Sequence, residues 1–158
     1  MVDARIFADL KADHDRHRDL LKRIDAAAAD ARGDLFAAFR VDVTAHAAAE
    51  EESLYATMLP DPELRDDARH SVSEHKEVDD LLGELVDLDI GSDEWKAKFD
   101  QMRHRYEHHI DEEEEDMFPA ASKELSSEEE ERLAEVFERR KPKELERAET
   151  AQPGDERD

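Results

Sequence analysis

Two stretches of the chain place histidine and glutamate at the same spacing. HAAAEE begins at His46 and HIDEEE begins at His109, an offset of 63 residues. Residues four apart lie on one face of a helix, about 6 Å apart along its axis. Each histidine is therefore expected to point the same way as the glutamate four places later, Glu50 or Glu113.

A second pair of matching stretches lies upstream of each motif. DHDRHRDLL aligns with EHKEVDDLL at an offset of 61 residues, which puts His14 and His75 at equivalent positions. One HxxxE is weak support, because 46 of the 158 residues are acidic and five of the eight histidines have a carboxylate four places later. The joint pattern is more informative: two helical hairpins, each with one upstream histidine and one HxxxEE motif.

These side chains could converge on one centre. Neighbouring helices in a bundle lie ~8–10 Å apart, so four inward imidazoles can meet within a few ångströms. Glu50 and Glu113 could then bridge two metal ions about 3.5–4 Å apart. Imidazole suits iron and zinc, and bridging carboxylates suit di-iron and di-manganese centres. Burying these groups without an ion would be costly, so the pattern predicts a dinuclear metal site.

The apolar periodicity predicts five helices, with a break at Gly33 and N-caps at Ser92 and Ser126. The expected ranges are 3–30, 34–59, 62–89, 93–122 and 126–141. We expect an all-α fold, an up-down-up-down four-helix bundle with a short fifth C-terminal helix. Residues 1–141 form this domain, and 142–158 are expected to be a disordered, mobile acidic tail.

Composition narrows the classes of partner. The formal net charge is −23, which repels nucleic acid and anionic membranes, and no cysteine is present for disulfides or thiolate metal sites. No segment has the apolar length of a signal peptide or a membrane span. A cytoplasmic protein without nucleic-acid or membrane partners is therefore expected.

Together these motifs give the chain a family resemblance. With HI..EE..MFP in the fourth helix, the pattern resembles the hemerythrin-like (HHE cation-binding) domain over about residues 3–122. The resemblance implies a four-helix bundle that holds two Fe ions, with or without an oxo or hydroxo bridge, and with Mn or Zn as substitutes. The implied metal ligands are His14, His46, Glu50, His75, His109 and Glu113.

The third helix departs from the oxygen carriers of that family. The carriers have an HxxxH pair there, whereas the residue four places after His75 is Asp79. Asp79, His17 or a second glutamate could take the vacant position, or one iron lacks a histidine. Reversible oxygen carriage is therefore less expected than the redox or iron-repair activities of the family.

The glutamate pairs leave a further choice open. The fourth-helix ligand is either Glu113, at four places after the histidine, or Glu114, at the five places that the carriers use. Glu51 and Glu114 otherwise accept the second N–H of a ligating imidazole or carry surface charge. The histidines assigned to solvent-facing positions are His70, His104 and His108.

The leading hypothesis is a non-haem di-iron protein that binds or reacts with dioxygen, nitric oxide or peroxide, in sensing, detoxification or stress response. The alternative is a module that stores, senses or donates iron for the repair of iron centres, without turnover. A zinc or manganese hydrolase is disfavoured, since no HExxH, nucleophile motif or phosphate-binding loop is present. The sequence does not decide between enzyme and binding protein, and it identifies neither a redox partner nor an oligomeric state.

Overall fold

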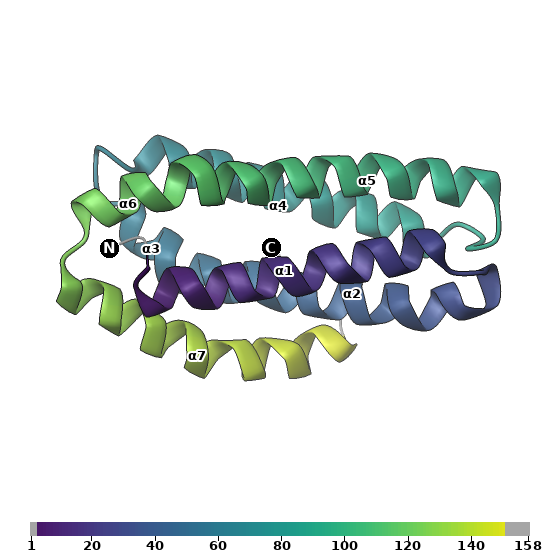
Figure 1. Cartoon of the computed structure of the whole chain (residues 1–158), viewed down its shortest axis with the longest axis horizontal. Coiled ribbons are helices and arrows are strands. Elements are labelled where there is room, and N and C mark those ends of the chain that lie inside the picture. Colours follow the sequence, from purple (N-terminus) through teal and green to yellow (C-terminus); the bar gives the residue numbers. More distant parts are fainter. Residues whose placement is uncertain (1–2, 151–158) are drawn as a thin grey trace.

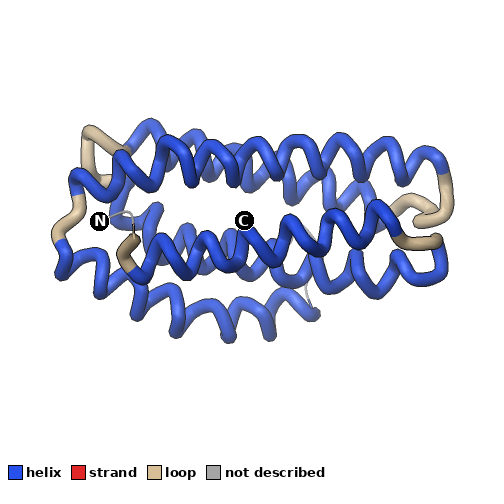
Figure 2. Tube along the Cα trace, in the orientation of Figure 1, coloured by secondary structure: helices blue, strands red, loops and turns tan. Residues whose placement is uncertain are grey.

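The computed structural model describes residues 3–150, which form helices and no strand (Figures 1 and 2). The elements are α1 (Arg5–Ala26), α2 (Ala29–Glu50), η1 (Glu51–Tyr55), α3 (Ala56–Met58), α4 (Arg65–Val86), α5 (Asp93–Glu112), η2 (Glu113–Met117), α6 (Phe118–Glu124) and α7 (Ser127–Thr150). The two η elements are π-helical turns that continue α2 and α5 directly.

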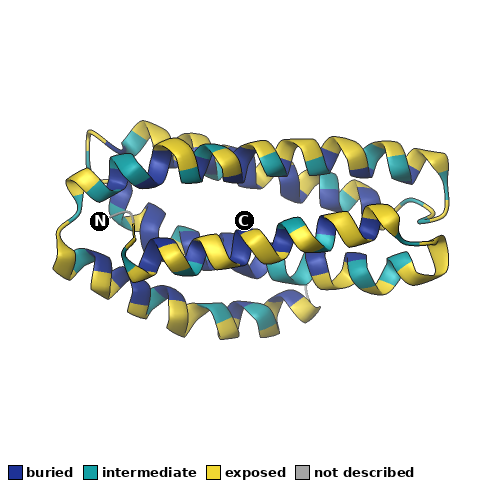
Figure 3. Cartoon of the chain, viewed as in Figure 1, coloured by how far each residue is buried: buried dark blue, intermediate teal, exposed yellow. Residues whose placement is uncertain are grey.

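Four long helical rods make the bundle: α1, α2 with η1 and α3, α4, and α5 with η2 and α6. α1 packs along α2 and α4 packs along α5, and loops join consecutive rods at alternate ends of the molecule (Figures 1 and 2). The predicted up-down-up-down four-helix bundle is confirmed. Buried residues form stripes on the inward faces, with exposed residues outside (Figure 3).

The core is divided into two apolar clusters with a polar layer between them. Along α1, Ile6 and Leu10 belong to one cluster and Leu21 and Ile24 to the other, while the buried His14 lies between them in sequence. The same order of apolar, polar and apolar residues recurs along the other rods. Dry packing on both sides therefore encloses the middle of the bundle.

The first turn differs from the sequence prediction. Ala27 and Ala28 adopt extended backbone angles and separate α1 from α2. Gly33, which was expected to separate the first two helices, lies inside α2. A side chain at this position would meet nothing within 4 Å. Glycine costs only about 1 kcal/mol in a helix, and the burial of Phe36 and Phe39 farther along α2 holds the segment helical.

Two predicted helix starts are confirmed. The Ser92 side chain accepts a hydrogen bond from the Trp95 backbone N–H at 3.1 Å. Ser126 and Glu129 form a reciprocal capping box, in which each side chain accepts from the other's backbone N–H, at 2.9 and 3.1 Å. The helix expected from residue 62 begins three residues later, at Arg65.

The fifth helix is longer than predicted. α7 continues through Pro142 to Thr150, so the assignment of residues 142–150 to a mobile tail is wrong. Proline removes one helical hydrogen bond, at a cost of about 3 kcal/mol, but packing of α7 along α2, with Ala148 buried beyond the proline, favours continuation. α7 packs against α1 and α2 (Figure 1). The rest of the predicted tail, 151–158, lies outside the described residues.

No helix in the described part of the chain has both the length and the apolar character required to cross a membrane.

The contact between α1 and α7 makes stability depend on pH. Burial and the neighbouring Glu138 raise the pKa of Asp9 to about 7 from its ordinary 3.8. Because the folded pKa is the higher one, protonation stabilises the folded chain. This stabilisation is complete below pH 3.8 and is lost as the pH rises through about 7.

We predict that Asp9→Asn raises the melting temperature by about 2–4 °C at pH 8, because it removes a half-buried charge beside Glu138, and changes it little at pH 4. Thermal unfolding followed by circular dichroism measures both values. Asp19→Asn, at an exposed position on the same helix, is the control and should leave the melting temperature unchanged. Equal shifts of Asp9→Asn at both pH values would contradict the assignment.

Candidate metal centre

The six predicted ligands meet in the polar layer. They come from α1, α2, α4, α5 and η2, and none is more than 5% exposed. The i, i+4 spacing keeps each HxxxE pair on one face, and the bundle brings the four rods together. The six residues are His14, His46, Glu50, His75, His109 and Glu113.

Each central carboxylate faces two imidazoles from different rods. Glu50 Oε1 lies 3.5 Å from His46 Nε2 and 3.3 Å from His75 Nε2. Glu113 Oε1 lies 3.2 Å from His14 Nε2 and 3.6 Å from His109 Nε2. Two ligand atoms about 2.1 Å from one ion lie about 3.0–3.4 Å apart, so these spacings suit metal coordination.

The donor atoms form two compact sets that share one residue. His14, His46, Glu50 and Glu113 make one set, and Glu50, His75 and His109 make the other, with all donor atoms of a set within 4.8 Å of one another. A carboxylate common to both sets is the arrangement that a bridging ligand requires.

Several inward atoms are buried without a hydrogen-bond partner. They are Nε2 of His14, His46 and His109, both carboxylate oxygens of Glu50, and Oε1 of Glu113. Unsatisfied polar groups in a dry interior cost several kcal/mol, and these atoms all present lone pairs. A cation would satisfy all of them, so the residues fit a metal site.

The outer nitrogen of every imidazole is held by a carboxylate. The Nδ1–H groups donate at 2.7–2.8 Å, His14 to Glu114, His46 to Asp13, His75 to Glu51 and His109 to Glu74. Such a bond fixes the tautomer that leaves Nε2 free for a metal. The structure therefore places Glu113 inward and Glu114 outward, with Glu51 in the role equivalent to Glu114.

Sequence reasoning missed Asp13 and Glu74. Each directly precedes a candidate histidine in the sequence but accepts from a histidine on the next helix of the bundle. The sequence signal that could have identified them was an acidic residue directly before the histidine in both repeats. Burial alone would raise the pKa of Asp13, but the bond from His46 and the charge of Lys141 on α7 outweigh it and lower that pKa. Lys141 Nζ lies 2.9 Å from Asp13 Oδ2.

The π turns coincide with the glutamate pairs. η1 starts directly after Glu50 and η2 starts at Glu113. A π turn inserts an extra residue into the helix and is frequent at functional sites. Here the wider turn occurs where one glutamate faces inward and the next faces outward.

The two halves of the centre differ at one aromatic position. The Tyr55 hydroxyl donates to Glu113 Oε2. Burial raises the pKa of Tyr55 well above 10, so it remains a phenol. The equivalent residue of the second repeat is Phe118, which stacks on His14 with ring centroids 6.0 Å apart. Of the two central carboxylates, only Glu113 accepts a tyrosine hydroxyl.

The candidates for an additional ligand lie beside the centre. Both nitrogens of the buried His17 have protein partners, because Nδ1 accepts from the Tyr106 hydroxyl at 2.6 Å and Nε2 donates to Asp42. Burial lowers the pKa of His17 to about 4, outweighing Asp42 and keeping the ring neutral. Asp79 is buried next to His75 in the lining of a small cavity. Neither His17 nor Asp79 belongs to a ligand set among the described residues.

We predict that Asp13→Asn weakens metal binding about 10–100-fold, because the amide orients and polarises the His46 imidazole less well than the carboxylate. Competition between protein and a chelator for Co²⁺ measures the affinity. Asp15→Asn, an exposed change two residues away on α1, should leave it unchanged. An unaltered affinity of Asp13→Asn would show that this hydrogen bond does not support the ligand.

Comparison with known proteins agrees with this geometry. Searches of curated proteins and of solved structures found no match. The family model described as hemerythrin HHE cation binding domain matches residues 5–121, close to the range over which the sequence showed the resemblance. The chain belongs to the hemerythrin HHE cation-binding family, and binding of metal ions is the property that this membership implies.

Proposed function

We propose that the chain is a non-haem di-iron protein that binds or reacts with dioxygen, nitric oxide or peroxide. The observation that carries the proposal is the pair of ligand sets that share Glu50. Most of their donor atoms are buried and have no hydrogen-bond partner. Two ferrous ions held there would supply two electrons to a small oxidant. The proposed ligands are the six residues that meet in the polar layer.

The donor set supports iron. It contains imidazole nitrogens and carboxylate oxygens, and the chain has no cysteine to provide thiolates. This mixture suits iron and manganese in dinuclear carboxylate centres, and zinc can substitute. The chain's own contribution is to fix four imidazoles by their Nδ1 bonds and one carboxylate by the Tyr55 hydroxyl.

The cavity beside the centre favours a very small ligand. It measures about 10 Å³ and is lined by His46 and His75 together with apolar side chains such as Val43 and Leu82. That volume is about that of one water-sized probe, so an organic substrate would not fit without movement. Phe137 of α7 does not line this cavity; it packs on the His46 ring with centroids 5.9 Å apart.

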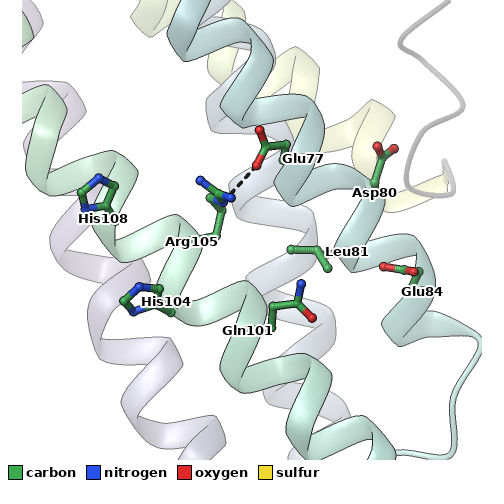
Figure 4. Close-up of a pocket in the computed structure, with 8 residues that line it drawn as sticks. All are labelled: Glu77, Asp80, Leu81, Glu84, Gln101, His104, Arg105 and His108. Atoms are coloured by element: carbon green, nitrogen blue, oxygen red, sulfur yellow. Dashed lines mark ion pairs between the residues drawn. The ribbon is translucent and has the colours of Figure 1, made fainter.

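A much larger groove lies away from the centre. It occupies about 550 Å³ between α4 and α5, where Arg105 pairs with Glu77 at 2.9 Å (Figure 4). None of its lining residues belongs to either inner ligand set. The groove therefore provides no binding site for a substrate next to the proposed irons.

Iron storage, sensing or donation without turnover is the second candidate. One observation favours it: a cavity lined by His109 and Glu113 is also lined by exposed acidic residues, including Asp67 and Asp116. An acidic opening suits the passage of a cation. Slow release of iron to an apo-acceptor, without any reaction with oxidants, would support this function over the first.

We predict about two iron ions per chain in protein prepared under nitrogen, with new near-ultraviolet and visible bands on exposure to air. Metal analysis and an optical spectrum measure both. Bands that bleach again under vacuum indicate reversible binding, and permanent bands indicate redox chemistry.

Replacing both His46 and His109 by alanine should remove the iron and the bands, because each ligand set loses an imidazole. His104→Ala, an exposed change on α5, is the matched control and should retain both. Full iron content in the double variant, or absence of iron from the parent protein, would overturn the proposed centre.

A further inference from the structure

A second cluster of potential ligands lies at the surface, near the inner centre. We propose that His70, Glu74 and Glu112 form an outer site for a divalent cation, through which ions reach the inner centre. The role in loading rests on the proposed di-iron function, whereas the outer site itself does not.

The spacing of the three side chains suits one ion. His70 Nε2 lies 3.4 Å from Glu74 Oε2 and 3.8 Å from Glu112 Oε1, and the donor atoms all lie within 4.8 Å of one another. One imidazole and two carboxylates are ligands that zinc, manganese and ferrous iron accept. The His70 side chain is 60% exposed, so an ion can reach the cluster from solvent.

Glu74 connects the outer cluster to the inner centre. Its Oε1 accepts the Nδ1–H of His109, while its Oε2 faces His70. A cation on Oε2 would therefore be one carboxylate and one imidazole away from an inner metal position. The link couples the charge of an outer ion to the His109 imidazole, while any route for the ion itself must lie beside it.

The charge around Glu74 differs from that around the carboxylates that hold His46 and His14. Asp13 and Glu114, which hold two other imidazoles, each pair with lysine or arginine. In the described part of the chain Glu74 has no such partner, and its recorded ion pairs are with His70 and His109 only. A bound cation would supply the positive charge that lysine and arginine supply elsewhere.

A cavity of about 50 Å³ lies between the two sites. His70 and Glu112 line it, as do His109 and Glu113 of the inner centre. His109 Nε2 and Glu113 Oε1 are among the buried inward atoms without hydrogen-bond partners. The cavity therefore has potential cation ligands at the surface and unsatisfied ones at depth, and its acidic lining would concentrate cations.

The larger groove in Figure 4 provides a contrast on the same two helices. It also contains carboxylates and histidines, but the Arg105 guanidinium already neutralises Glu77 there. Its residues do not form a set of three close donor atoms in the described structure. Carboxylates and histidines on α4 and α5 therefore do not by themselves produce a set of three close donor atoms like that at His70.

The test uses metal-free full-length chain and Co²⁺ alone as the probe. Equilibrium dialysis counts bound ions, and stopped-flow visible absorption follows loading. The outer variant is His70→Ala with Glu112→Gln, which leaves Glu74 on His109. The control is His104→Ala with Glu77→Gln, which removes one histidine and one carboxylate from the neighbouring groove.

The parent chain and the control should bind one Co²⁺ more than the outer variant. The outer variant should load the inner centre about 10-fold more slowly or worse, the low end of electrostatic focusing. An unchanged ion count or an unchanged loading rate in the outer variant would overturn the inference.

A third variant separates this inference from the proposed function. His14→Ala with His46→Ala removes inner ligands far from the outer cluster in sequence, and it should lose inner ions while retaining the outer one. If it binds as many ions as the parent chain, the proposed inner centre fails. The outer site is then still judged by the His70 and Glu112 variant alone.

Discussion

The structure depends on the burial of six metal-directed side chains at the middle of a dry bundle. Buried carboxylates cannot remain there without positive charge nearby, and buried imidazole nitrogens need a hydrogen-bond or metal partner. Burial would lower the pKa of His14, but Glu113 and Glu114 outweigh it and raise that pKa to about 9. Without metal, protons on the imidazoles supply the charge, and a metal ion that binds at Nε2 displaces them.

The need for compensating charge extends to the side chains around the centre, where negative and positive groups alternate. Each imidazole is held by a carboxylate, and outer carboxylates are in turn held by cations, as Asp13 is by Arg16 and Lys141. Because Lys141 lies on α7, the helix added to the four-helix bundle takes part in positioning His46. Glu74 is the outer carboxylate whose remaining oxygen faces a histidine, and there the network opens toward solvent.

The internal repeat gives the centre an approximate twofold arrangement, and its departures from symmetry separate the two halves. Tyr55 donates to one central carboxylate, whereas Phe118 at the equivalent position stacks on an imidazole. α7 packs along α1, α2 and η1 and places Phe137 on the His46 ring, whereas the acid-lined cavity lies between α4 and α5–η2. The small cavity proposed for an oxidant is lined mainly by α2 and α4, so the two proposals assign oxidant and cation to different faces of one duplicated pattern.

The sequence by itself determined the all-α class, the bundle and five of the six inward side chains, because apolar periodicity and i, i+4 spacing are local to each helix and the repeat relates the two hairpins. The choice of Glu113 over Glu114 came from the structure, where Glu113 faces inward and Glu114 accepts from His14. The sequence did not determine the roles of Asp13 and Glu74, since each orients an imidazole on another rod. Nor did it give the extent of α7: burial beyond Pro142 outweighs the local cost of proline. Only tertiary structure decided these features, because contacts between helices supply free energy that local spacing and propensity do not contain.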